Sequence, residues 1–64
     1  MSEELANEFI GKVCTVYSDN TFGIQGKIIY VQDKWLKIET KSQVKLVNLD
    51  YVTYIDVLPE KYQK

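Results

Sequence analysis

The side chains that could do chemistry in this 64-residue chain are cations, amides and aromatic rings. The chain has no histidine, and Cys14 is its only cysteine. A general base, an activated nucleophile and a His/Cys metal site each need partner groups that this composition does not supply. We therefore expect a protein that is not an enzyme, with no catalytic residue, no metal site, no cofactor and no evident small-molecule substrate.

Cys14 is expected to be a small buried hydrophobic residue. It lies beside Val13 and close to Val16, in a run of residue types that favour strands. A reactive thiol needs exposure and a cationic environment, so we expect Cys14 to be unreactive in the folded chain.

Binding chemistry is better represented than catalysis. Trp35 follows a predicted turn, where its ring can stack on a nucleobase or can instead cover one end of the fold beneath a helix. Asn48 and Asp50 can bind a polar ligand or can cap a turn. If RNA binds, the residues that we expect to contact it are Lys27, Lys34, Trp35 and Asn48.

Lysines and tyrosines on the predicted strands have two interpretations each. The lysines can line a track for phosphates, or they can be solvated and guard against edge pairing; they are Lys27, Lys37 and Lys45. The tyrosines can form an interaction surface, or they can pack across strands within one subunit; they are Tyr17, Tyr30, Tyr51 and Tyr54.

The composition is that of an ordinary globular chain with little attraction for polyanions. Hydrophobic residues make up 45% and charged residues 27%, and the net charge is −1. Nonspecific binding to nucleic acid needs clustered positive charge, which this balance does not favour. No stretch approaches the roughly 20 apolar residues of a membrane span, and the acidic start Met1–Glu4 does not resemble a secretion signal. We expect a cytoplasmic protein with no membrane partner.

One short helix is predicted at about residues 3–10. Ser2 is a suitable N-cap, and Gly11 is a suitable residue just beyond the helix end. Leu5 and Phe9 are spaced to share one face, with Ala6 beside them. A helix this short is stable only when it packs on something else.

Five strands are predicted between about residues 12 and 58, where the hydrophobic period changes to two. Turn-forming residues at 19–21 separate the first strand, 13–18, from a long second one, 22–32. Gly26 inside the second strand indicates a bend or a close approach of another backbone. A third strand follows at 35–39, and Pro59 ends the last, at 51–58, in which Val52, Tyr54 and Asp56 share a face. The polar tail at 60–64 is expected to fray.

The hairpin after the third strand has a predicted register. A five-residue connection at 40–44 sets Glu39 opposite Lys45 and Ile38 opposite Leu46. This register pairs opposite charges on the outer face and apolar residues on the inner face.

The whole chain is predicted to be one all-β domain, 1–64, with one short N-terminal helix and a strongly bent, five-stranded small barrel. A domain of this size buries only about 60% of the surface of its unfolded chain, so its core is marginal. With one cysteine an intrachain disulfide is impossible, and self-association is the remaining way to add stability.

Glycines and apolar positions of the first half resemble the first signature of the Sm family. The matching residues are Gly11, Cys14, Val16, Asp19, Asn20, Phe22, Ile24, Gly26, Ile28 and Val31. The segments Ile24–Ile28, Ser42–Gln43 and Val52–Pro59 are similar to the bacterial Hfq branch. The resemblance implies a homo-oligomeric ring in which the last two strands pair with neighbouring subunits and one face binds single-stranded RNA. The implied interface residues are Tyr51, Val52, Tyr54 and Ile55.

Two segments depart from the family pattern. Family members carry an Asp and an Asn after the bent strand, where this chain has Gln32–Trp35. They carry Arg-Gly, or Lys-His in Hfq, where this chain has Asn48–Asp50, with no cation and an added carboxylate. These departures favour the alternative prediction, a protein-interaction or structural small-barrel module that lacks the RNA pocket.

Overall fold

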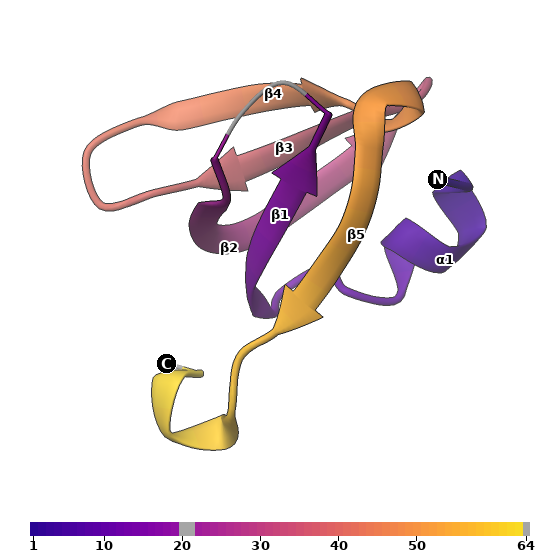
Figure 1. Cartoon of the computed structure of the whole chain (residues 1–64). Coiled ribbons are helices and arrows are strands. Elements are labelled where there is room, and N and C mark those ends of the chain that lie inside the picture. Colours follow the sequence, from indigo (N-terminus) through magenta and orange to yellow (C-terminus); the bar gives the residue numbers. More distant parts are fainter. Residues whose placement is uncertain (20–21, 64) are drawn as a thin grey trace.

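The chain forms one curved antiparallel sheet with a short helix at its N-terminus (Figure 1). The computed structural model describes residues 1–19 and 22–63. The elements in chain order are α1 (Glu3–Asn7), β1 (Val13–Ser18), β2 (Ile24–Gln32), β3 (Trp35–Glu39), β4 (Val44–Asn48), the 3₁₀ helix η1 (Leu49–Tyr51), β5 (Val52–Val57) and the 3₁₀ helix η2 (Glu60–Tyr62). The prediction of an all-β fold with one short N-terminal α-helix is confirmed. The predicted turn at 19–21 lies mostly outside the described residues.

The sheet is open. Its strand order is β4-β3-β2-β1-β5, so β4 and β5 are the two edges and do not pair with each other. The prediction of a barrel is therefore not confirmed in this detail. Between the two edge strands the chain passes through η1, and the buried side chains of Leu49 and Val52 close the core there in place of a further strand pair.

The helix packs on the sheet through Ala6. The Ser2 hydroxyl accepts a hydrogen bond from the Leu5 backbone N–H at 3.2 Å, as the predicted cap requires. Gly11 has a φ of +89°, which suits glycine. The expectation that Leu5 and Phe9 share a packed face is wrong, because α1 ends at Asn7 and leaves Leu5 57% exposed while Phe9 packs against the core.

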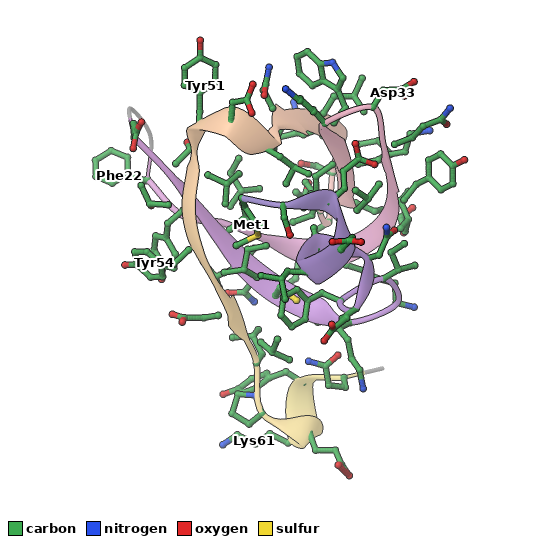
Figure 2. All side chains as sticks on the ribbon, turned by 90° about the vertical axis from the view of Figure 1, so that its right-hand side faces the viewer. Met1, Phe22, Asp33, Tyr51, Tyr54 and Lys61 are labelled. Carbon is green, nitrogen blue, oxygen red and sulfur yellow. The ribbon has the colours of Figure 1, made fainter. Side chains whose placement is uncertain are left out.

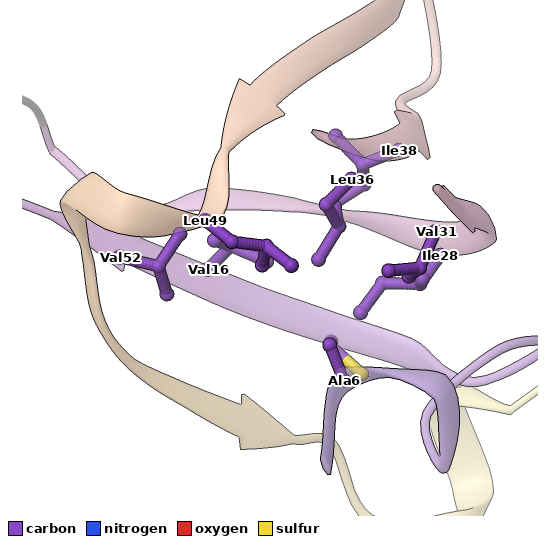
Figure 3. Close-up of a cluster of buried hydrophobic side chains, with 9 residues drawn as sticks. Ala6, Val16, Ile28, Val31, Leu36, Ile38, Leu49 and Val52 are labelled. Carbon is purple, nitrogen blue, oxygen red and sulfur yellow. The ribbon is translucent and has the colours of Figure 1, made fainter. Parts of the chain in front are cut away.

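Nine buried apolar residues among those described form the core, which draws on α1, η1 and every strand except β4 (Figure 3). They are Ala6, Cys14, Val16, Ile28, Val31, Leu36, Ile38, Leu49 and Val52. The predicted burial of Cys14 and the predicted inner position of Ile38 are confirmed. We call the sheet face that bears these residues the inner face and the opposite face the outer face.

The predicted register of the β3–β4 hairpin is wrong by one residue. Ile38 lies opposite Lys45, and Lys37 lies opposite Leu46. The connection has four residues rather than five, because Thr40 closes it through two hydrogen bonds to Gln43. The Thr40 backbone N–H donates to the Gln43 carbonyl at 2.7 Å, and the Thr40 hydroxyl accepts from the Gln43 N–H at 3.0 Å. Leu46 is consequently on the outer face and 61% exposed.

A bulge in the β1–β5 pair changes which β5 residues face inward. Tyr17 pairs with Tyr54, but its neighbour Ser18 pairs with Val52, so Thr53 is the extra residue. The prediction that Val52 and Tyr54 share a face is wrong, because Val52 is buried in the core and Tyr54 is exposed.

Gly26 lies where β3 approaches closely. A Cβ atom added to Gly26 would lie 2.9 Å from the Glu39 carbonyl carbon and 3.1 Å from Ile38 Cγ1. The predicted close approach of another backbone is confirmed. The expectation of a frayed tail is wrong for residues 60–63, which form η2 and a C-terminal cap described below.

Candidate functional site

A polar row crosses the outer face at one end of the sheet. Gln32 of β2, Trp35 of β3 and Asn48 of β4 are direct neighbours across the strands. Trp35 is 46% exposed, while Leu36 beside it is fully buried on the inner face. Trp35 therefore does not cover the fold beneath the helix, which packs on the inner face through Ala6.

Lys34 is held next to this row by a constrained turn. Asp33 and Lys34 connect β2 to β3 with φ values of 52° and 70°. The Lys34 backbone N–H donates to Glu3 Oε2 at 2.9 Å, and the Lys34 carbonyl accepts from the Leu49 N–H at 2.8 Å. The N-terminal amino group in turn donates to the Leu49 carbonyl at 2.9 Å. These contacts fix the Lys34 backbone and leave its ammonium group for other partners.

Asn48 has the capping role that was one of its two predicted interpretations. Its Oδ1 accepts a hydrogen bond from the Asp50 N–H at 2.9 Å and caps η1. The carboxamide nitrogen of Asn48 remains as the group that can contact a ligand on the outer face.

A shallow hollow of about 330 Å³ lies beside Trp35. Tyr30, Lys37 and Leu46 form one cross-strand row of it, next to the row of Trp35. We call Tyr30, Gln32, Trp35, Lys37, Leu46 and Asn48 together the Trp35 surface. The sequence places Tyr30 and Lys37 on strands, but only the observed register brings them together with Leu46.

Lys27 does not belong to this surface. It lies opposite Glu39, toward the other end of β2, and lines a separate hollow of about 680 Å³. The structure therefore brings together three of the four predicted RNA-binding residues, namely Lys34, Trp35 and Asn48. A continuous lysine track is also absent from the described strands, because Lys45 is paired with the inward-facing Ile38 and Lys37 is on the opposite face.

Charges near the Trp35 surface balance one another. The cations are Lys34, Lys37 and the N-terminal amino group, and the carboxylates are those of Glu3, Asp33 and Asp50. The chemistry of this surface consequently suits rings and hydrogen-bonding groups more than it suits net charge.

The four predicted interface residues divide into two pairs. Tyr51 and Tyr54 are exposed, and the Tyr54 ring stacks on that of Tyr17 with centroids 4.3 Å apart and an interplanar angle of 19°. Figure 2 shows Tyr54 and Phe22 on the side of the molecule away from Asp33. Val52 is buried, and Ile55 packs against the core, so their side chains belong to the interior of the chain itself.

Cys14 is fully buried, as predicted. Burial raises the pKa of its thiol, and nearby Lys12 offsets part of this rise. Such a thiol is mostly protonated at neutral pH and is a weak nucleophile. Among the described residues, no group of three or more potential metal ligands is found, and no helix is long and apolar enough to cross a membrane.

Comparison of the chain with protein-family models, with curated proteins and with solved structures found no match.

Proposed function

We propose that this protein is a non-enzymatic, Sm-like and Hfq-like binding module of the cytoplasm that assembles as a homo-oligomer and binds single-stranded RNA. The observation that carries the proposal is an exposed tryptophan between two side-chain amides. Trp35 is flanked across the strands by Gln32 and Asn48, and Lys34 precedes it in the chain.

Four residues of the Trp35 surface, together with the adjacent Lys34, have roles in RNA binding. The Trp35 ring stacks on a base, a contact that contributes about 1–3 kcal/mol. The amides of Gln32 and Asn48 offer donors and acceptors to the edge of that base. The ammonium groups of Lys34 and Lys37 contact the flanking phosphates.

Self-association is supported by the two sheet edges. β4 carries exposed Val44 and Leu46, and β5 carries exposed Tyr54 and Val57. An open edge with apolar side chains favours pairing with another chain. Pairing β4 of one copy with β5 of the next is head-to-tail and closes into a ring when the rotation between copies permits.

The RNA part is tested by titrating labelled oligo-uridine and oligo-adenine at two salt concentrations and following fluorescence anisotropy. We expect binding that weakens with salt, a roughly tenfold or greater loss in Trp35→Ala, and partial retention in Trp35→Phe, which keeps a stacking ring. Leu5→Ala is the matched control, since Leu5 is an exposed apolar residue on α1. No binding by the folded wild-type protein would rule out the RNA function.

The second candidate function is a protein-interaction module. It is favoured by the carboxylates of Asp33 and Asp50 beside the Trp35 surface, which repel phosphates, and by the exposed side chains of Tyr30 and Leu46. Failure of every oligonucleotide to bind, together with a stable homo-oligomer, would select this alternative.

A further inference from the structure

The hollow beside Lys27 is built by segments that are distant in the sequence. It opens among β2, the end of β3, the β3–β4 loop and η2, and its volume of about 680 Å³ is twice that beside Trp35. The side chains that matter for its chemistry are Gln25, Lys27, Glu39, Lys41, Ser42 and Tyr62. Figure 2 shows Lys61, the neighbour of Tyr62, at the end of the molecule opposite Asp33.

Gln63 fixes the C-terminal wall of this hollow. Its Oε1 accepts the Val13 N–H at 2.6 Å, and its Nε2 donates to the carbonyls of Val13 at 2.8 Å and Leu58 at 2.9 Å. The side-chain amide thus pairs with Val13 as a neighbouring strand would. This contact holds η2 against β1 and keeps Tyr62 at the wall.

Cations exceed carboxylates around the hollow. Lys27 and Lys41 line it together with the single carboxylate of Glu39. Glu60 and Lys61 of η2 carry opposite charges and do not line the hollow; the Lys61 Nζ lies 5.2 Å from the centroid of the Tyr62 ring. Two ammonium groups against one carboxylate give the lining a local excess of positive charge in a chain whose net charge is −1. The hollow therefore favours an anionic ligand.

The remaining groups favour a ligand with a ring and polar edges. The Tyr62 side chain is half exposed, so it can stack on a ligand ring. Within the described part of the chain, the Gln25 amide and the Ser42 hydroxyl have no hydrogen-bond partner, which leaves both able to bind a ligand.

We propose that this hollow binds a nucleoside phosphate. The phosphate lies between the ammonium groups of Lys27 and Lys41, the base stacks on Tyr62, and Gln25 and Ser42 bond the base or the sugar. The same chemistry is presented by a free nucleotide and by one nucleotide of an RNA chain. The proposal does not depend on RNA binding at the Trp35 surface.

The test is a titration of the ¹⁵N-labelled protein, followed by amide chemical shifts, with AMP, with inorganic phosphate and with oligo-adenine in separate arms. We expect AMP to shift the amides of Lys27, Lys41 and Tyr62. The double variant Lys27→Ala, Lys41→Ala should bind AMP at least roughly tenfold more weakly. Lys45→Ala, which removes an exposed lysine outside the hollow, should bind as the wild type does. Tyr62→Ala should lose several-fold in affinity, and Tyr62→Phe should restore it.

The separate titrations distinguish a free nucleotide from RNA as the ligand. They also distinguish binding at the hollow from binding at the Trp35 surface. Shifts of these amides with AMP identify a free nucleotide as sufficient, and shifts with oligo-adenine alone identify RNA as the source. Inorganic phosphate binding as tightly as AMP would overturn the role of the base. No shift at the hollow in any arm would overturn the site itself. The amides of Trp35 and Asn48 report on the Trp35 surface and lie outside the hollow, so failure of RNA binding at that surface is distinguishable from failure at the hollow.

Discussion

Lys34 combines an unfavourable backbone conformation with a place at the Trp35 surface. Its φ of 70° lies in the left-handed region, where a side chain costs about 1–2 kcal/mol. The two-residue turn between β2 and β3 has positive φ at both positions, a type in which glycine is favoured. Glu3 and Leu49 hold the Lys34 backbone in this conformation. Contact of the Lys34 ammonium group with RNA would explain why this position carries lysine in spite of the conformational cost.

Replacing Lys34 by glycine should separate stability from binding. We expect Lys34→Gly to raise the free energy of unfolding in urea by about 1 kcal/mol, because glycine adopts this φ without strain. The same variant should bind oligo-uridine more weakly. Asp33→Gly is the control: aspartate tolerates the left-handed region better than lysine, so its stability gain should be smaller. Undiminished RNA binding by Lys34→Gly would remove Lys34 from the site.

The residues of the candidate site were only partly predictable from the sequence. Trp35 and Lys34 follow from the turn that precedes β3, and Asn48 follows from its place at a strand end. The charge of Lys27 and its place in the Hfq-like segment Ile24–Ile28 favour grouping it with them, but a strand of nine residues carries it toward the other end of the sheet. Tyr30 and Leu46 were missed as partners because their proximity depends on the register of two hairpins.

At the scale of elements, the close contact between β2 and β3 depends on Gly26. We expect Gly26→Ala to destabilise the fold by about 1–3 kcal/mol, since the added methyl group would meet the Glu39 backbone, which is fixed by the sheet. Gly23→Ala is the matched control. There the new methyl group would lie 2.7 Å from side-chain atoms of Thr15 and Tyr17, which must shift, and we expect a smaller loss because side chains move at a lower cost than sheet backbone. Urea denaturation measures both, and equal losses in the two variants would contradict the role given to β3.

The positions of the strands were predictable because burial on one face imposes a period of two. The register between paired strands was less predictable. The apolar pattern of 35–46 fits a five-residue connection, yet Thr40 closes a four-residue one and moves Leu46 to the outer face. In β5 the bulge at Thr53 shifts the pattern in the same way. Local hydrogen bonds within a loop or a bulge decide the register, and a hydrophobic pattern does not record them.

At the scale of the whole molecule, both edges of the sheet present apolar side chains to solvent. Val44 and Leu46 lie on β4, and Tyr54 and Val57 lie on β5. A chain of 64 residues buries a small apolar area in its core. Covering these edges with further copies would therefore add apolar burial that stabilises the fold. Because the two edges differ, each copy can pair with two others, one at each edge.

The molar mass in solution tests this arrangement. We expect light scattering to give a multiple of the 7.5 kDa chain mass for the wild-type protein. Leu46→Lys should reduce it to that of one chain while the circular dichroism spectrum stays that of the folded protein, because a charge on an edge strand opposes pairing. Gln32→Lys, which adds the same charge to the exposed face of the interior strand β2, should leave the oligomer intact. A wild-type protein that is monomeric at all concentrations would exclude the ring. It would also exclude the pairing of the β4 and β5 edges with further copies.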